Sequence, residues 1–303
     1  MRDMKPKILV ILGPTATGKS DVAVKLAQKF NGEIISADSR QVYKGMDLGT
    51  GKITKREMWG IPHYLLDVAN PKTQFSVAQF QKLAKDKINE ILKRDKLPII
   101  CGGTGFYIDT LVNGLHFPEV PANKNLRKKL EKKSVGLLFT MLKKLDPARA
   151  KSIDKYNKVR LIRAIEIAQT LGKVPKIKSR HLYDSIYIGL DLPDLALRER
   201  INIRLKRRLE AGMMAEMKRL YKSGVSYRQL ESFGLEYRNC ALFLQKKITK
   251  KQLTENLEKE IWHFAKRQRT WFRRNHKIIW FNPLKKDTMT QIKKLVTTYS
   301  LSK

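Results

Sequence analysis

The sequence is poor in cysteine and has no long apolar run, and both absences exclude classes of protein. Cys101 and Cys240 are the two cysteines among 303 residues, and their separation matches no metal-ligand spacing. No apolar run approaches the roughly 20 residues that span a bilayer, and the first residues lack a cleavable secretory pattern. We therefore expect a reduced, cytoplasmic protein with no membrane segment.

Acidic residues are also scarce. The chain has 28 Asp and Glu against 63 Lys and Arg, which gives a formal net charge of +35. A field of this size attracts polyanions, with nucleic acid as the leading candidate. A lysine-rich, solvated surface with no such partner would give the same composition. The positions of the basic residues must therefore decide between these two interpretations.

Short apolar runs separated by helical stretches predict a parallel sheet with helices on both faces. The predicted strands are Lys7–Leu12, Glu33–Ala37, Leu97–Cys101, Ser185–Leu190 and Lys277–Phe281, and one predicted helix covers Ser76–Arg94. The segment 120–183 differs, because it is dense in Lys and Arg and has helical periodicity. We predict an α/β fold of the P-loop NTPase type, with its core at 1–119 and 184–303 and a helical insertion at 120–183.

What the sequence does contain is a complete phosphate-binding loop. Residues 13–20, GPTATGKS, satisfy the pattern G-x-x-x-x-G-K-[ST] between an apolar run and a helical stretch. Its glycines let backbone N–H groups approach phosphate oxygens, and the helix N-terminus adds positive potential. Lys19 would reach the terminal phosphates, and the Ser20 hydroxyl would ligate Mg²⁺. The predicted phosphate-binding residues are Gly13, Thr15, Ala16, Thr17, Gly18, Lys19 and Ser20.

Two more polar residues follow predicted strands of this sheet. Asp38 follows the strand Glu33–Ala37, and Thr104 lies in the glycine-rich segment after Leu97–Cys101. Since the carboxyl ends of parallel strands share one crevice, both residues should lie near the phosphate loop. Asp38 could help to hold Mg²⁺ or act as a general base, or it could merely cap the next turn.

Two predicted helices carry basic residues in an ordered way. In the helix that follows Asp194, Arg200, Arg204 and Arg208 form a stripe beside the apolar one. The other helix covers about 250–275, and its end carries the densest basic cluster of the chain, 265–274. This cluster is the natural candidate for a polyanion-binding surface.

Five motifs, in this order, resemble those of the tRNA dimethylallyltransferases. They are the phosphate loop 13–20, SADSRQVYKGMDLGTGK at 36–52, PHYLLD at 62–67, GGTGFY at 102–107 and KRQRTWF at 266–272. The resemblance runs from about residue 7 to about residue 275. Members of this family prenylate N6 of the adenosine on the 3′ side of the anticodon. The resemblance therefore implies dimethylallyl diphosphate and tRNA as substrates, with Mg²⁺ as cofactor.

The resemblance also assigns roles at the crevice. The phosphate loop is expected to hold the diphosphate of dimethylallyl diphosphate. Arg204 looks like the family's arginine that reaches the same diphosphate, although a solvated helix face would also explain it. Asp38 matches the general base for the exocyclic amine. The expected catalytic residues are thus Asp38, Ser20 and Arg204, and the expected metal-binding residues are Ser20 and Asp38.

Other matched positions are expected to contact tRNA. Around the target base, which must leave the anticodon stack, they are Asp38, Ser39, Arg40, Gln41 and Thr104. In the basic cluster they are Lys266, Arg267, Gln268, Arg269, Thr270, Trp271 and Arg273, and in the insertion they are Arg160 and Arg163. Arginine and lysine can neutralise phosphates, whereas Trp271 could stack on a base or fill the core.

The chain departs from the family pattern at two places. Leu235 follows Gly234 where many members have tyrosine, which puts base contacts from this loop in doubt. The segment 154–158 lacks a frequent His-Pro sequence. Neither place belongs to the expected diphosphate site.

Three other functions stay open at this point. A relative that prenylates free adenylate to form cytokinins would need neither the insertion nor the basic cluster. A P-loop ATPase or kinase acting on RNA would use the loop for ATP, but a separate metal-binding Asp after an apolar strand is not obvious. A non-catalytic, nucleotide-gated RNA-binding protein would make Asp38 dispensable. We expect a monomeric enzyme that modifies tRNAs decoding codons that begin with U.

Overall fold

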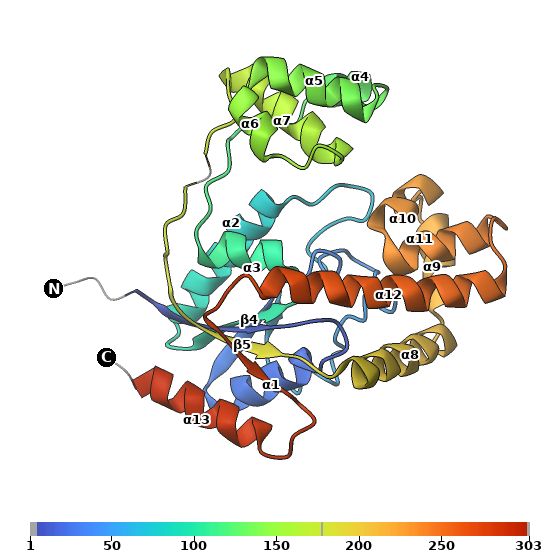
Figure 1. Ribbon diagram of the computed structural model, residues 1–303. Coiled ribbons are helices and arrows are strands. Elements are labelled where there is room, and N and C mark those ends of the chain that lie inside the picture. The colour runs from blue at the N-terminus through green and yellow to red at the C-terminus, as the bar shows by residue number, and fades with distance from the viewer. Residues whose placement is uncertain (1–4, 177, 302–303) are drawn as a thin grey trace. The chain divides into compact units, whose positions relative to one another are not determined.

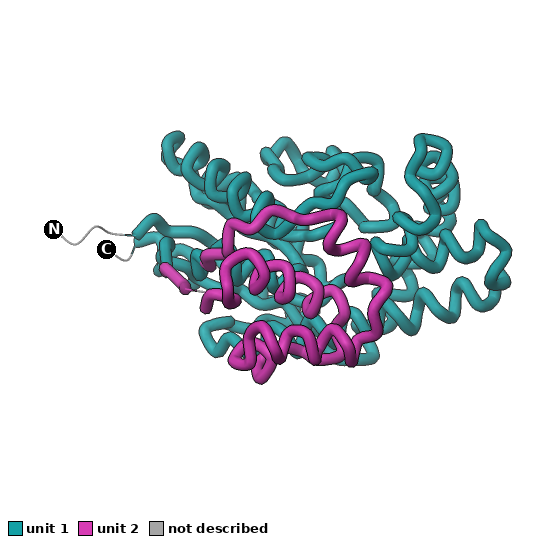
Figure 2. Tube along the Cα trace, turned by 90° about the horizontal axis from the view of Figure 1, so that it is seen from above, with its two compact units in different colours: residues 1–114, 181–303 teal, residues 115–180 magenta. Residues whose placement is uncertain are grey.

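The computed structural model describes residues 5–176 and 178–301 and divides into two compact units. The first unit comprises residues 1–114 and 181–303, and the second comprises residues 115–180 (Figure 2). The second unit is therefore an insertion in the chain of the first. No helix among the described residues is long and apolar enough to cross a bilayer.

In the described part of the chain, the first unit is built on six parallel strands in the order β3-β2-β4-β1-β5-β6. The strands are β1 (Lys7–Leu12), β2 (Gly32–Ser36), β3 (His63–Tyr64), β4 (Leu97–Gly102), β5 (Asp184–Leu190) and β6 (Ile278–Phe281). This confirms the predicted α/β fold and places all five predicted strands within about one residue of their expected bounds. The edge strand β3 is missing from the prediction because it is too short to show a pattern.

Helices cover both faces of this sheet. On one face, Ile8, Val10 and Leu12 of β1 pack with α2 (Val77–Leu92) and α3 (Gly105–Val112). On the other face, Leu9 and Ile11 pack with α1 (Lys19–Lys29) and α13 (Thr288–Leu301). Successive side chains of a strand point to opposite faces, so two covered faces explain why β1 is apolar throughout.

The remaining helices of the first unit pack around a second apolar core. They are α8 (Asp194–Glu210), α9 (Met213–Lys222), α10 (Tyr227–Phe233), α11 (Leu235–Leu244) and α12 (Lys250–Phe272). The apolar stripe that the sequence predicts for α8 consists of Leu197, Ile201, Leu205 and Leu209, of which the first three are buried and Leu209 is half-buried. A capping box of Thr249 and Gln252 starts α12, which runs from these helices towards α3 (Figure 1).

The second unit has four described helices and a core of its own. They are α4 (Lys124–Glu131), α5 (Val135–Leu145), α6 (Pro147–Ser152) and α7 (Lys158–Leu171), and they enclose Leu138, Leu142 and Leu161. A buried carboxylate, Glu166, links α7 to the start of the unit by accepting a hydrogen bond from the N–H of Asn123 at 2.7 Å. Burial alone would raise the pKa of Glu166, but hydrogen bonds from two arginines outweigh burial and lower it to about 2.

The sheet prediction can be tested at its centre. Leu9 is fully buried in β1, so Leu9→Ala should lower the free energy of unfolding by about 2–5 kcal/mol. Leu195 is 83% exposed on α8, and Leu195→Ala should change this free energy by less than about 0.5 kcal/mol. Urea denaturation followed by circular dichroism measures both. Equal losses in the two variants would contradict a packed core at β1.

Candidate active site at the carboxyl ends of the strands

Four neighbouring strands deliver polar groups to one edge of the sheet. Asp38 follows β2, Thr104 follows β4, and the phosphate loop follows β1. Helix α8, which carries Arg204, follows β5, the next strand in the sheet order. Because all four strands are parallel, their carboxyl ends share this edge. The structure therefore brings together the groups that the sequence predicts for the crevice.

The phosphate loop is tightly folded against β5. Gly13 has a φ of 142°, and a Cβ at this position would lie 2.2 Å from the carbonyl oxygen of Leu190. Gly18 caps α1 with a φ of 85°. The Thr17 hydroxyl and the Lys19 ammonium both donate to the carbonyl of Pro14, at 3.0 and 2.5 Å. The first N–H groups of α1 have no intrahelical partner, so this end of the helix favours an anion.

Lys19 is electrostatically coupled to the other groups of the crevice. Removal from solvent lowers the pKa of its ammonium to about 8, and the charge of Arg204 also lowers it, whereas Asp38 raises it. The coupling shows that the three side chains lie close enough to affect one another. An anion bound at the loop would reverse the effect of burial and favour the charged ammonium.

Asp38 caps the turn after β2 and keeps one carboxylate oxygen outside that cap. Its Oδ1 accepts hydrogen bonds from the N–H of Arg40 at 2.8 Å and of Gln41 at 3.3 Å, so this oxygen caps the turn after β2. No described residue donates a hydrogen bond to its Oδ2. The side chain is half-buried. The turn thus fixes the carboxylate and leaves one oxygen free for a proton or a ligand.

The turn that carries Asp38 is held from two sides. The N–H of Ser39 donates to the Thr104 hydroxyl at 3.0 Å, and Arg40 donates to the carbonyl of Phe233 at 2.8 Å. The departure at Leu235 falls close to this anchor. Leu235 has a φ of 41°, in the left-handed region that is strained for a leucine.

The arginine stripe of α8 faces the segment 48–51 and the phosphate loop. Arg204 donates to the carbonyl of Gly51 at 3.1 Å. Arg208 donates to the carbonyls of Leu48 and Gly49 and pairs with Glu236 at 3.0 Å. A Cβ at Gly18 would lie 3.9 Å from the Arg200 guanidinium. The side chain of Arg204 is solvent-exposed but is directed by this carbonyl contact.

The basic cluster of α12 divides into an engaged and an exposed set. Gln268 accepts from the N–H of Thr15 at 2.8 Å and donates to the carbonyl of Gly103 at 2.9 Å, which joins the phosphate loop to the loop after β4. Arg269 is buried and pairs with Asp191 at 2.9 Å and with Asp194. The engaged set also includes Trp271, whose indole N–H donates to Asp109 at 2.8 Å. The exposed set is Lys266, Arg267, Thr270 and Arg273.

The two arginines predicted to contact tRNA in the insertion also differ. Arg163 donates to Glu166 and to the carbonyl of Val120, the latter at 2.9 Å. Arg160 is exposed, and its ion pair with Asp154 spans 3.9 Å. Within the second unit, Arg160 is therefore available to a ligand, whereas Arg163 is held in the fold.

Sequence reasoning missed Glu216, which organises a loop of the site. Its carboxylate accepts hydrogen bonds from the N–H groups of Asp47, Leu48 and Gly49 at 2.9, 2.7 and 3.0 Å. The signal in the sequence was an acidic residue on the apolar stripe of α9, between Met213 and Leu220. A single acid on such a stripe indicates that hydrogen bonds compensate its burial, but the pattern does not identify the donors.

Oxygen donors suited to a magnesium ion lie at the same edge. Ser20 has an exposed hydroxyl at the start of α1, and Asp38 has its free Oδ2. No group of three or more His, Cys, Asp or Glu side chains that could hold a metal ion occurs among the described residues. Mg²⁺ usually takes few protein ligands and completes its shell with substrate phosphates and water. The residues present therefore fit such an ion.

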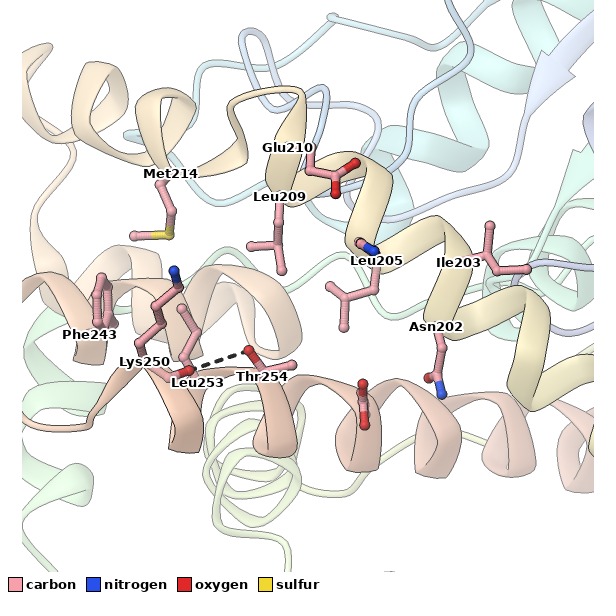
Figure 3. Close-up of a pocket in the computed structure, with 12 residues that line it drawn as sticks. Asn202, Ile203, Leu205, Leu209, Glu210, Met214, Phe243, Lys250, Leu253 and Thr254 are labelled. Carbon is pink, nitrogen blue, oxygen red and sulfur yellow. Dashed lines mark hydrogen bonds between the residues drawn. The ribbon is translucent and has the colours of Figure 1, made fainter.

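A separate cavity of about 700 Å³ lies between α8 and α12 (Figure 3). Leu209, Met214 and Phe243 give it an apolar lining. Its α8 residues include Asn202 and Lys206, which lie on the opposite face of that helix from Arg204. None of the residues that line it belongs to the predicted site.

Comparisons with known proteins agree on one family. The family model described as IPP transferase matches residues 41–275. A curated tRNA dimethylallyltransferase from Anoxybacillus flavithermus is 41% identical over 285 residues, which cover 92% of this chain and 91% of that protein. The crystal structure of the full-length tRNA isopentenylpyrophosphate transferase from Bacillus halodurans aligns with a TM-score of 0.74 and 36% identity, over 97% of this chain and 96% of that one. A eukaryotic dimethylallyltransferase acting on tRNA aligns with a TM-score of 0.84 and 27% identity, over 97% of this chain and 79% of that one.

The lowered pKa of Lys19 makes anion binding by the loop depend on pH. The ammonium attracts a diphosphate while it is charged and loses its proton as the pH rises through about 8. We expect the affinity for inorganic pyrophosphate, measured by titration calorimetry, to fall between about pH 7 and pH 9. In Lys19→Arg the guanidinium stays charged. The affinity of this variant should therefore change with pH only because pyrophosphate itself gains or loses protons. Identical pH profiles would show that Lys19 does not carry the effect.

Proposed function

The chain belongs to the IPP transferase family, and we propose the following reaction for it. It transfers a dimethylallyl group from dimethylallyl diphosphate to N6 of the adenosine on the 3′ side of the anticodon, in tRNAs that decode codons beginning with U. The observation that carries this proposal is the gathering of Lys19, Asp38 and Arg204 at one edge of the sheet. A site for an anionic leaving group and a proton acceptor meet there.

The phosphate loop holds the diphosphate of the donor in this proposal. Lys19 and the first N–H groups of α1 stabilise the negative charge that develops as the allylic C–O bond breaks. Arg204 adds a second cationic side chain. Its described hydrogen-bond partner is the neutral carbonyl of Gly51, so the contact directs the guanidinium without cancelling its charge.

Asp38 is the proposed general base. N6 attacks the allylic carbon, the C–N bond forms as the C–O bond breaks, and the diphosphate leaves with the C–O electron pair. The N6 proton passes to Oδ2 of Asp38, the oxygen that the turn leaves free. Thr104 and the neighbouring residues Ser39, Arg40 and Gln41 line the side of the crevice at which the target base enters.

Ser20 supplies the oxygen donor that we assign to Mg²⁺, while Oδ2 of Asp38, at the same edge, is reserved for the N6 proton, because one oxygen cannot bind the metal and accept that proton together. When bound, the ion adds positive charge against the diphosphate. The exposed hydroxyl of Ser20 at the first turn of α1 supports this assignment, because it is adjacent to the Lys19 ammonium in the chain.

The exposed basic residues are the proposed tRNA contacts. Lys266, Arg267, Thr270 and Arg273 are exposed and accessible to phosphates, as is Arg160 in the second unit. The engaged residues Gln268, Arg269, Trp271 and Arg163 serve the same purpose indirectly, because they hold the elements from which the exposed ones project.

The alternatives have less support. A transferase acting on free adenylate needs neither a second unit nor an exposed basic cluster, and an ATPase or kinase does not account for the motif at 36–52. Both cysteines are buried and unpaired, which supports a cytoplasmic location.

Asp38→Asn tests the proposed base. Asparagine keeps an oxygen that can cap the turn but cannot take a proton, so we expect transfer to fall by about 10²–10⁴-fold with little change in tRNA affinity. Mass analysis of tRNA incubated with dimethylallyl diphosphate and Mg²⁺ measures the product. Asp86→Asn, at an exposed position of α2, serves as the control. Unchanged transfer by the Asp38 variant would rule out the base. Hydrolysis of ATP stimulated by tRNA, without prenyl transfer by the wild type, would instead favour an ATPase.

Arg267 and Arg269 provide a matched pair for the basic cluster. Arg267→Ala should weaken tRNA binding and reduce the slope of log affinity against log salt by roughly one, with unchanged thermal stability. Arg269→Ala leaves Asp191 and Asp194 without their partner and should lower the free energy of unfolding by about 2–3 kcal/mol. Filter binding at several salt concentrations and urea denaturation separate the two effects. A flat salt dependence of the wild type would argue against phosphate contacts by this cluster.

A further inference from the structure

A buried carboxylate in α9 has no role in the reaction as described so far. Glu216 is 1% exposed and lies on the apolar stripe of α9 beside Met213, Met217 and Leu220. Taking a carboxylate out of water costs several kcal/mol unless hydrogen bonds compensate. An apolar residue at this position would avoid that cost, so stability of α9 alone does not account for the acid.

Hydrogen bonds from one loop and one tyrosine offset the cost of burying the Glu216 carboxylate. Glu216 accepts from three consecutive backbone N–H groups, those of Asp47, Leu48 and Gly49, and from the hydroxyl of Tyr237 in α11 at 2.8 Å. Burial and the neighbouring Glu216 raise the pKa of Tyr237 well above its usual value, so the phenol stays protonated and donates. Its ring also packs on the loop, since a Cβ at Gly49 would lie 2.6 Å from it.

The opposite side of this loop meets the arginines of α8. Arg208 donates to the carbonyls of Leu48 and Gly49 at 3.3 and 3.2 Å. Arg204 donates to the carbonyl of Gly51 at 3.1 Å. The N–H groups of the segment 47–49 therefore point to Glu216, while carbonyls of the same stretch direct the guanidinium groups. Fixing an arginine side chain costs much rotamer freedom. The Gly51 carbonyl can therefore hold Arg204 in one position only if the segment 47–51 is itself held in place.

We propose that Glu216 and Tyr237 are positioning residues for the transfer reaction. They hold the segment 47–51 in the conformation in which the Gly51 carbonyl directs Arg204 towards the diphosphate. The expected effect on kcat rests on the proposed function, whereas the expected effect on pyrophosphate affinity does not require it.

A double-mutant cycle tests the coupling. Glu216→Gln leaves one oxygen to serve several donors, and we expect pyrophosphate affinity and kcat each to fall about 10-fold, with tRNA affinity unchanged. Tyr237→Phe removes one hydrogen bond and keeps the ring on Gly49, so a loss of about 3-fold is expected. In an Arg204→Ala background, neither change should cost more than about 2-fold, because the group that they position is gone.

The matched control is Glu33→Gln. Glu33 is a 2% exposed carboxylate in β2 that accepts from the Tyr64 hydroxyl and from Lys96, both at 2.8 Å, near the amino ends of the strands. It should lower thermal stability without lowering pyrophosphate affinity or kcat.

The outcomes separate the inference from the proposed function. The positioning role would be overturned if the Glu216 and Tyr237 variants lost as much pyrophosphate affinity in the Arg204→Ala background as in the wild type. It would also be overturned if they lost stability but no pyrophosphate affinity. If Glu216→Gln does not fold, the same cycle with Tyr237→Phe gives the answer. Absence of prenyl transfer by the wild type would overturn the proposed function, while the pyrophosphate cycle would still decide the inference.

Discussion

The crevice depends on backbone segments that approach one another too closely for a side chain to intervene. A Cβ at Gly13 would lie 2.2 Å from the carbonyl oxygen of Leu190, and one at Gly102 would lie 2.2 Å from that of Ala37. Gln268 adds hydrogen bonds that join the phosphate loop to the loop after β4. Groups from separate strands therefore keep fixed relative positions, which is the condition under which several weak electrostatic effects can act on one reacting bond.

The partner of Arg204 differs in kind from the partners of Arg269 and Arg163, which support the fold. Arg269 and Arg163 are paired with carboxylates, so their charge is already compensated within the chain. Arg204 is held by the carbonyl of Gly51, a neutral dipole that fixes its direction without forming an ion pair. The net charge of +35 does not make this distinction. The distinction depends on whether each guanidinium donates to a carboxylate or to a carbonyl oxygen.

Much of the sheet and of the crevice could be predicted because both depend on local pattern. The apolar strands, the phosphate loop and the position of Asp38 after β2 follow from runs and spacings within one segment of chain. The partners of Arg269 could not be predicted in this way. It shares a helix turn with exposed Arg267 and differs only in which face it presents, and its partner Asp191 is 78 residues away in the chain. Glu216 was missed for the same reason, because a stripe shows that a residue is buried but not which donors satisfy it.

The order of the strands also bears on the proposal that the phosphate loop holds a leaving group. Asp38 follows β2 and the phosphate loop follows β1, and β4 lies between these strands in the sheet. Neighbouring strands are about 4.8 Å apart, so the backbone origins of the base and of the loop are separated by roughly 10 Å. In phosphoryl transfer the nucleophile lies directly beside the phosphorus that the loop holds. In allylic transfer the carbon that reacts stands between the amine and the diphosphate, so the base belongs one group further away. In the proposed reaction the interposed strand β4, which Thr104 follows, provides that distance.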